Sequence, residues 1–195
     1  MLLFVLHCSY YSEWTLCEKL AHSEAFSSVL TESRAIVRYI CDKYPNQGPN
    51  LHGSTLSDKA QVEQWLEVES QTFTPVVRIL ILHLLVGPTL SVDTTNSESV
   101  VAEYTEKLAT ILDVYEARLS RSKYLAGDFL SIADLSHVPT GYYYFNHAKQ
   151  MELLSSRKHV AAWWEDISNR PSWKIVVENA GPSFDNWYRP RCTTT

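Results

Sequence analysis

The second half of the chain alternates apolar and polar residues with the period of an α-helix. The longest such run extends from Ser97 to Leu119, with apolar residues at three- and four-residue steps. These are Val101, Tyr104, Leu108, Ile111, Leu112, Tyr115 and Leu119. Shorter runs predict a helix from His159 to Ser168 and another from Pro171, where a proline in the first turn costs little. The pattern therefore predicts a mainly helical domain.

A stretch from Pro45 to Ser54 interrupts the helical pattern. It contains two prolines, two glycines and two asparagines, a composition typical of a linker between domains. Before it, residues 32–44 have the apolar spacing of a helix, and residues 26–31 fit a short strand. The order of these segments predicts a short α/β piece, a linker and then a helical domain.

A long helix is predicted directly after the linker. Thr55 and Asp58 have the spacing of a capping box, in which each residue satisfies a backbone N–H of the other. The apolar spacing continues to about Leu85, with a kink at Pro75 because proline lacks the N–H that the helix needs. Gly87-Pro88 is expected to end this helix.

Ser131 and Asp134 mark the start of another helix. Their spacing fits a capping box, and Leu130 and Leu135 occupy the positions of a hydrophobic staple. His137 shares a helix face with them, which raises a catalytic triad as an alternative. A hydrolase serine belongs on a tight G-x-S-x-G turn, and capping already accounts for both residues. We therefore interpret Ser131 and Asp134 as a structural capping box.

Composition and charge narrow the possible functions. The chain has 195 residues, of which 45% are hydrophobic, so it can bury a substantial core. Its formal net charge is -5 and its basic residues are scattered singly, which argues against binding nucleic acid or an acidic membrane surface. The apolar run from Leu2 to Leu6 is too short for a signal peptide or a membrane span. The expected partners are small molecules or proteins.

The cysteines and histidines do not indicate a metal site. The four cysteines lie far apart without a C-x-x-C pair, and the seven histidines lack H-x-x-x-H or H-E-x-x-H spacing. We therefore expect no bound metal. This use of cysteine fits a reduced, cytoplasmic protein.

Glu32 and Ser33 lie where the predicted short strand meets the next helix. The N–H groups of the first helical turn and the Ser33 hydroxyl can hold a carboxylate, while Glu32 can pair with an ammonium group. Together they suit the zwitterionic end of an amino acid. The spacing alone favours the alternative, in which Thr31 or Ser33 simply caps the helix.

Two further groups of residues are candidates for a site. Phe73, Ile79 and Tyr143 can line an apolar pocket for a hydrophobic ligand, although such residues more often form core. Near the N-terminus, Ser9 and Ser12 follow an apolar run and are candidates for a hydroxyl that donates to a thiolate.

Several long segments resemble the plant phi-class glutathione transferases. They are Glu32–Ile40, Tyr44–Leu51, Gln61–Glu69, Leu112–Ser120, Lys123–His137 and Trp163–Trp173. These motifs occur in the family's order, and the resemblance covers about residues 28 to 180.

The resemblance implies a thioredoxin-like domain that binds glutathione, followed by an all-helical domain that supplies most of the pocket for a hydrophobic co-substrate. The family's Glu-Ser pair at this junction binds the γ-glutamyl end of glutathione, so Glu32 and Ser33 are expected to do so. The family's capping motif, here Ser131 and Asp134, is structural. The resemblance also implies a soluble homodimer that uses glutathione as co-substrate and needs no cofactor.

The first 31 residues depart from the family pattern. A single βαβ unit needs roughly 30 residues, and no proline precedes Pro45 to match the family's cis-proline segment. We expect a truncated or replaced thioredoxin-like domain at residues 1–44, a linker at 45–56, a helical transferase domain at 57–184 and a tail at 185–195. The expected fold class is mainly α, with an incomplete α/β domain in front.

The expected function is conjugation of the glutathione thiolate to hydrophobic electrophiles, in detoxification and stress response. Truncation is expected to weaken or abolish this activity. One alternative is a non-catalytic, ligandin-like carrier of aromatic small molecules. The other is a partner subunit that forms a heterodimer with an intact related transferase.

Overall fold

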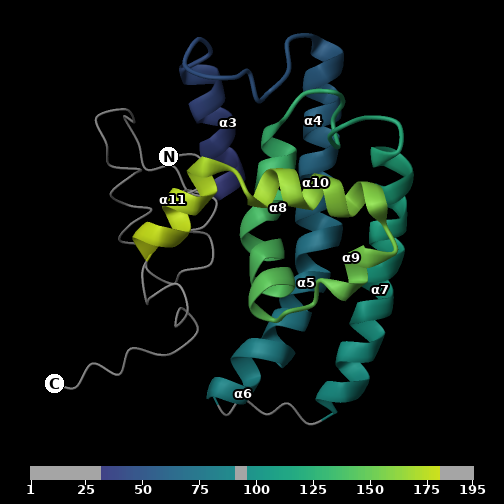
Figure 1. Cartoon of the computed structure of the whole chain (residues 1–195). Helices are drawn as coiled ribbons and strands as arrows, with labels where there is room; N and C mark the ends of the chain where they lie inside the picture. The colour runs from purple at the N-terminus through teal and green to yellow at the C-terminus, as the bar shows by residue number, and fades with distance from the viewer. Residues whose placement is uncertain (1–31, 91–95, 181–195) are drawn as a thin grey trace, which may run out of the picture.

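The computed structural model describes residues 32–90 and 96–180, and these residues are mainly helical (Figure 1). The α-helices are α3 (Ser33–Lys43), α4 (Leu56–Val68), α5 (Thr74–Ile81), α6 (Gly87–Leu90), α7 (Ser97–Leu119), α8 (Ile132–Gly141), α9 (Glu152–Ser155), α10 (Lys158–Ser168) and α11 (Pro171–Ala180). Three π-helical segments are η1 (Glu69–Phe73), η2 (Leu82–Val86) and η3 (Tyr142–His147). The strand predicted at residues 26–31 and the thioredoxin-like interpretation of residues 1–31 lie outside the described residues.

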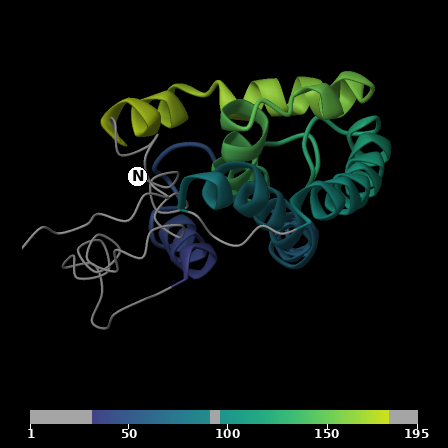
Figure 2. The same cartoon turned by 90° about the horizontal axis from the view of Figure 1, so that it is seen from below.

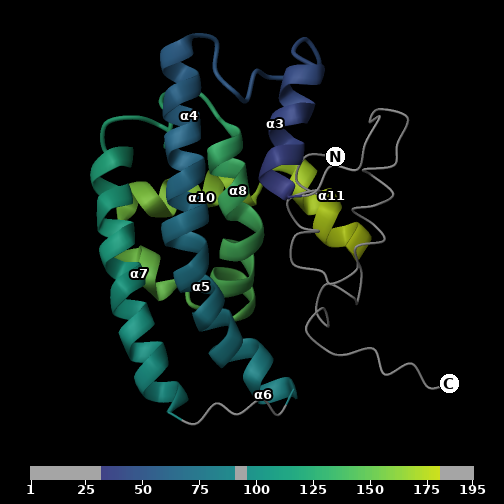
Figure 3. The ribbon, with the colours of Figure 1, turned by 180° about the vertical axis from the view of Figure 1, so that it is seen from behind.

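The helices after the linker form a bundle. α4, α5 and α6 follow one another as a long rod, and α7 and α8 lie beside it (Figures 1 and 3). α5 packs against α7, α4 packs against α8, and α10 packs across both α7 and α8. Figure 2 shows α10 and α11 along one side of the bundle and α3 on the opposite side.

The long rod accommodates its prolines through π-helical segments. The Gly87 N–H donates to the Leu82 carbonyl, five residues earlier, and Pro88 follows directly. The same arrangement, in η1, precedes Pro75. A wider turn at these points absorbs the loss of the proline N–H. The expectation that Gly87-Pro88 ends the helix is therefore wrong, because helical structure continues through α6 to Leu90.

The other helix predictions in the described residues are confirmed. α7 has the predicted bounds, and α10 begins one residue before the predicted start. Residues 44–55 are irregular, as expected of the linker. Thr55 and Asp58 form the predicted capping box at the start of α4, with hydrogen bonds of 3.0 Å in each direction.

Ser131 and Asp134 form their capping box in the interior of the bundle. The Ser131 backbone N–H and hydroxyl donate to Asp134 Oδ2 at 2.9 and 2.7 Å. The Leu125 N–H and the Trp163 indole N–H donate to Asp134 Oδ1, each at 3.0 Å. Burial raises the pKa of Asp134, and these hydrogen bonds offset part of that effect. The Asp134 carboxylate thus joins three segments, which are the loop before α8, the residue that caps α8, and α10.

Tyr115 and His137 form a second buried polar contact, surrounded by aromatic rings. His137 Nδ1 lies 2.8 Å from the Ala133 carbonyl, so this nitrogen carries the proton, and Nε2 accepts the Tyr115 hydroxyl at 2.8 Å. The Phe73 and Trp163 rings lie 4.8 and 5.3 Å from the His137 ring. Burial lowers the pKa of His137 from 6.5 to about 3, so the imidazole is neutral.

Ser131→Ala is expected to lower the free energy of unfolding by about 1 to 2 kcal/mol, because it removes a helix cap and a hydroxyl that donates to a buried carboxylate. Chemical denaturation followed by tryptophan fluorescence measures this change. Thr55→Ala is the matched control. The Thr55–Asp58 capping box is exposed, so water can replace the lost hydrogen bond, and we expect a smaller decrease in the free energy of unfolding. Equal unfolding midpoints for Ser131→Ala and the wild type would contradict the structural role.

The neutral His137 predicts a dependence of stability on pH. The unfolded chain takes up this proton near pH 6.5 and the folded chain only near pH 3, so stability is lost as the pH falls between these values. Compared with His137→Gln, the wild type is expected to lose about 1.4 kcal/mol of unfolding free energy per pH unit between pH 5.5 and 4. Denaturant titrations at several pH values give the slope of unfolding free energy against pH for each protein. Subtracting one slope from the other removes the contribution of the titratable groups that both proteins contain. Parallel curves would mean that the folded chain protonates His137.

Candidate functional site

The N-terminus of α3 brings Glu32 and Ser33 together. Glu32 is exposed and has a backbone φ of 69° and ψ of 113°, a conformation unusual for a residue with a Cβ. Ser33 is only 7% exposed. The Glu32 side chain does not cap α3, so it is available to bind a cationic group. A hydroxyl and first-turn N–H groups beside a carboxylate can bind a ligand that carries one negative and one positive group.

Arg34 ties this end of α3 to the helical bundle. Its Nη2 and Nε lie 2.6 and 2.7 Å from Glu69 Oε2. The Glu69 side chain has no exposed surface, and its other oxygen accepts the Thr74 hydroxyl. Burial raises the pKa of Glu69, while Arg34 and Thr74 counter part of that effect. The guanidinium and the hydroxyl thus satisfy a carboxylate that is costly to bury alone.

A second ion pair fixes α3 one turn further along. Arg38 Nη2 lies 2.7 Å from Glu63 Oε2 and 3.5 Å from Glu67 Oε1. The hydrogen bond to Glu63 is the main reason that the pKa of Arg38 is raised. His52 of the linker lies between α3 and α4, 3.3 Å from Asp42 Oδ1 and 3.0 Å from Glu63 Oε1. Charged contacts therefore join α3 to α4 over two turns.

Apolar packing completes the attachment of α3. Ile36 and Val37 are 4% and 0% exposed, and α3 packs against α8. α3 is thus held by apolar contacts and by the ion pairs of Arg34 and Arg38, which fixes the position of Glu32 and Ser33 relative to the bundle.

The residues predicted to line a hydrophobic pocket lie mostly in the core. Phe73 and Tyr143 are each 1% exposed, and Ile79 is partly buried. The Phe73 ring packs against the rings of Tyr115 and His137, at 6.2 and 4.8 Å. A role of these residues in binding a co-substrate stays a prediction.

Two other sets of candidate residues have separate outcomes. His137 contacts Tyr115 and Ala133 rather than Ser131, and Ser131 is engaged in the capping box, which confirms the structural interpretation over a triad. Ser9 and Ser12 lie outside the described residues.

Glu69 and its contact with Arg34 were not predicted from the sequence. A signal was present, because Glu69 lies on the apolar stripe that also contains Leu66 and Phe73, at helical spacing. An acidic residue on a buried face needs a partner. The partner is 35 residues away in sequence, so only the fold reveals it.

Residues 32–90 and 96–180 contain no group of three or more histidine, cysteine, aspartate or glutamate side chains placed to hold a metal ion. Within the same ranges, no helix has the length and apolar character needed to cross a membrane.

The chain is similar in sequence to known glutathione S-transferases. Residues 73–171 match the glutathione S-transferase C-terminal domain. The chain is 49% identical over 146 residues to glutathione S-transferase F9 and 48% identical over 145 residues to glutathione S-transferase F10, both from Arabidopsis thaliana. These alignments cover 75% and 74% of this chain and 67% and 66% of the relatives, so the chain spans about two thirds of their length.

Solved structures show the same similarity. Poplar glutathione transferase F1 is 40% identical with a TM-score of 0.73, over 86% of this chain and 78% of that one. Maize glutathione S-transferase I, solved in complex with an atrazine–glutathione conjugate, is 38% identical with a TM-score of 0.72, over 81% of this chain and 72% of that one.

Arg34→Met is expected to lower the free energy of unfolding by about 3 kcal/mol, because it leaves the buried Glu69 carboxylate without its counter-ion. The control is the double variant Arg34→Met/Glu69→Gln, in which a neutral amide still meets Thr74 and about half of the loss or more is recovered. Urea denaturation of the three proteins measures both effects. If the unfolding free energy of Arg34→Met lies within about 0.5 kcal/mol of the wild-type value, the Arg34–Glu69 pair contributes little to stability.

Proposed function

The chain belongs to the phi class of plant glutathione S-transferases, and from this premise we propose that it binds glutathione at the N-terminus of α3 and conjugates it to hydrophobic electrophiles. The observation that carries the proposal is the Glu32–Ser33 pair, held in a fixed position on the helical bundle by Arg34.

The γ-glutamyl end of glutathione matches the chemistry of this site. It carries an α-carboxylate and an α-ammonium group on one carbon atom. The carboxylate accepts from the Ser33 hydroxyl and from the first-turn N–H groups of α3, where the helix dipole also favours a negative charge. The ammonium group pairs with the exposed Glu32 carboxylate. The two adjacent residues thus bind the two ends of one zwitterion.

The reaction follows from the thiol at the other end of the tripeptide. The thiol proton leaves to solvent, the thiolate sulfur forms a bond to an electrophilic carbon, and the leaving group departs with the electron pair of the broken bond. Lowering the thiol pKa by about two units supplies roughly 2.7 kcal/mol of preference for the reactive anion. Ser9 and Ser12 are the candidates for the hydroxyl that stabilises the thiolate. The conjugate bound to the maize relative supports aryl-type electrophiles as substrates.

We further propose a cytoplasmic location and a dimer, either with a second copy or with a related transferase. The free thiol of Cys41 is compatible with a reducing compartment. Light scattering coupled to gel filtration measures the mass of the purified chain, and a mass of one chain at micromolar concentration would contradict the homodimer.

The activity is tested with the full chain, glutathione and 1-chloro-2,4-dinitrobenzene, whose conjugate absorbs light. We expect turnover that exceeds the uncatalysed rate and saturates with glutathione, but is slower than that of an intact relative. Binding of a hydrophobic dye without turnover would favour the carrier instead. Turnover only after mixing with an intact relative would favour the partner subunit. Either result would overturn the proposal that this chain catalyses the conjugation on its own.

Ser33→Ala and Glu32→Gln are each expected to weaken glutathione binding by roughly tenfold to a hundredfold, because each removes a charge-assisted hydrogen bond to the ligand. Isothermal titration calorimetry of the purified chain measures the dissociation constants. The matched control is Glu178→Gln on the exposed face of α11, which is expected to leave the affinity unchanged. Wild-type affinity in both Ser33→Ala and Glu32→Gln would place the ligand elsewhere.

A further inference from the structure

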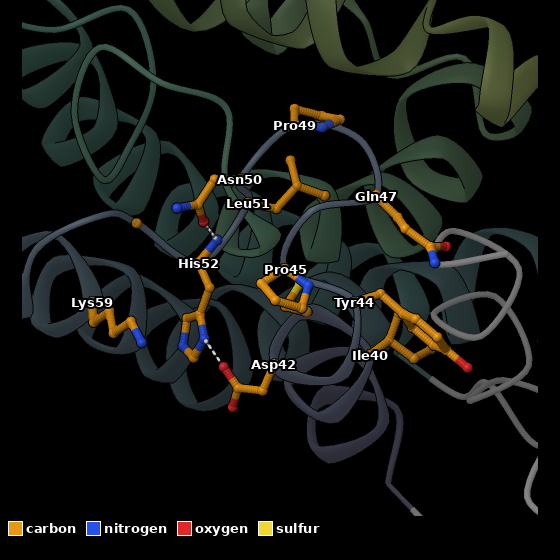
Figure 4. Close-up of a pocket in the computed structure, with 12 residues that line it drawn as sticks. Ile40, Asp42, Tyr44, Pro45, Gln47, Pro49, Asn50, Leu51, His52 and Lys59 are labelled. Carbon is orange, nitrogen blue, oxygen red and sulfur yellow. Dashed lines mark hydrogen bonds and ion pairs between the residues drawn. The ribbon is translucent and has the colours of Figure 1, made fainter. Parts of the chain in front are cut away.

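The linker is fastened to the end of α3 that lies away from Glu32 and Ser33. His52 Nδ1 lies 3.3 Å from Asp42 Oδ1, in the last turn of α3, and Nε2 lies 3.0 Å from Glu63 Oε1 on α4. Figure 4 shows the contact between His52 and Asp42, which are 10 positions apart, so the contact closes the linker into a loop. We propose that this contact is a pH-sensitive clasp, which is closed when the His52 ring carries two protons and opens when it loses one. The proposal does not depend on the glutathione site.

Both ring nitrogens of His52 face groups that accept hydrogen bonds. An ionised carboxylate has no proton to donate, and a neutral imidazole has a single N–H. A ring with one proton therefore satisfies one of the two carboxylates and directs the lone pair of its other nitrogen at the second. Only a ring with two protons donates to both Asp42 and Glu63 at the observed distances.

Glu63 is the fixed side of this arrangement. Burial acts to raise the pKa of Glu63, but hydrogen bonds from Arg38 and His52 outweigh this effect and lower the pKa, so the carboxylate is ionised at neutral pH. Arg38 Nε lies 2.9 Å from each Glu63 oxygen, and Arg38 Nη2 lies 2.7 Å from Oε2. The Glu63 carboxylate is therefore held by Arg38 whether His52 carries one proton or two.

Asp42 is the side that opens. Its side chain is 64% exposed, and it lies farther from the ring than Glu63 does. When the ring loses a proton, the N–H that remains at Nε2 keeps the hydrogen bond to Glu63, while Asp42 can turn into water at little cost. The loop then opens at α3, and the linker stays attached to α4.

The cations around His52 lie outside its direct contacts. Arg38 is bound to Glu63, and the Lys43 ammonium lies over two tyrosine rings, 5.3 and 5.7 Å from their centroids. Lys59 is exposed and lies beside His52 in Figure 4. These charges oppose a second proton on the ring, but water screens them, whereas the two carboxylates contact the ring directly.

The end of α3 adds a further reason for a positive charge at His52. The last carbonyls of a helix carry partial negative charge, which favours a cation beside them. Asp42 adds a negative charge in the same turn. The thiol of Cys41, which lines the same cavity, is neutral because burial and the charge of Asp42 raise its pKa to about 11. A proton on His52 thus meets the negative charge of this helix end.

The first test follows the ring nitrogens of the histidines by two-dimensional NMR of the full, isotope-labelled chain between about pH 5 and 8, where histidine changes charge. The neutral ring of His137 is the internal reference. At a given pH, we expect Asp42→Asn to lower the ratio of doubly protonated to neutral His52 about threefold to fivefold, as one exposed ion pair allows. Glu106→Gln, on the exposed face of α7, is expected to preserve the ratio. The same ratio in Asp42→Asn and the wild type would overturn the proposal.

The second test measures the opening itself. The Tyr44 N–H donates to the Ile40 carbonyl at 3.0 Å and closes the last turn of α3, so its hydrogen exchange reports fraying of this end. The rate in the wild type is divided by the rate in His52→Leu at the same pH, which removes the effect of pH on the exchange chemistry. We expect the wild type to be protected, relative to the variant, about threefold more at pH 6 than at pH 8.

The control for this second test is His159→Gln. The His159 ring also contacts a carboxylate, with Nδ1 lying 2.7 Å from Glu116 Oε1 at the start of α10, and a ring with one proton satisfies that contact. We expect this change to leave the exchange of the Tyr44 N–H unaltered at both pH values. A protection ratio between the wild type and His52→Leu that does not change with pH would overturn the clasp.

Discussion

The buried carboxylate of Glu69 is the constraint on which the candidate site depends. A carboxylate without exposed surface is stable only when it is paired and hydrogen-bonded. Arg34 supplies the counter-ion from α3, and Thr74 supplies a hydroxyl from α5. Because Arg34 directly follows Ser33, the residue that satisfies the bundle also fixes the start of α3. The stability of the helical bundle and the position of the glutathione site thus share one contact.

The same rule governs the centre of the bundle. Asp134 accepts four hydrogen bonds from three segments. Burial keeps His137 neutral, with one ring nitrogen donating to a carbonyl and the other accepting a hydroxyl. Such contacts are directional, so they specify how α7, α8 and α10 pack in a way that apolar area alone does not. The aromatic rings around His137 exclude water and make each polar contact costly to break. Buried polar groups therefore fix the arrangement of the helices against which α3 packs.

The features that could be predicted from the sequence are those that depend on the spacing of residues close together in the chain. The Ser131–Asp134 box depends on a three-residue spacing, and the stripe of α7 depends on a regular period, so both were found. Helical structure through Pro88 was missed because hydrogen bonding to the fifth residue back depends on packing around the proline. Phe73 cannot be assigned to core or pocket from its sequence position, because both environments require an aromatic side chain.

The candidate site was predicted only in part. Glu32 and Ser33 follow from the family resemblance, and the spacing alone favoured ordinary capping. Their attachment through Arg34 and Glu69 was not predictable, since that pair spans 35 residues of sequence and links two helices whose contact only the fold defines.

The proposed function depends first on the binding of glutathione at the start of α3. Its most direct test is a titration of isotope-labelled chain with glutathione, followed by amide chemical shifts in two-dimensional NMR. We expect the largest shifts at the amides of Ser33, Arg34 and Ala35, with a change at the Arg34 Nε–H, which takes part in the ion pair with Glu69. Saturable shifts confined to other helices, with those amides unmoved, would contradict it.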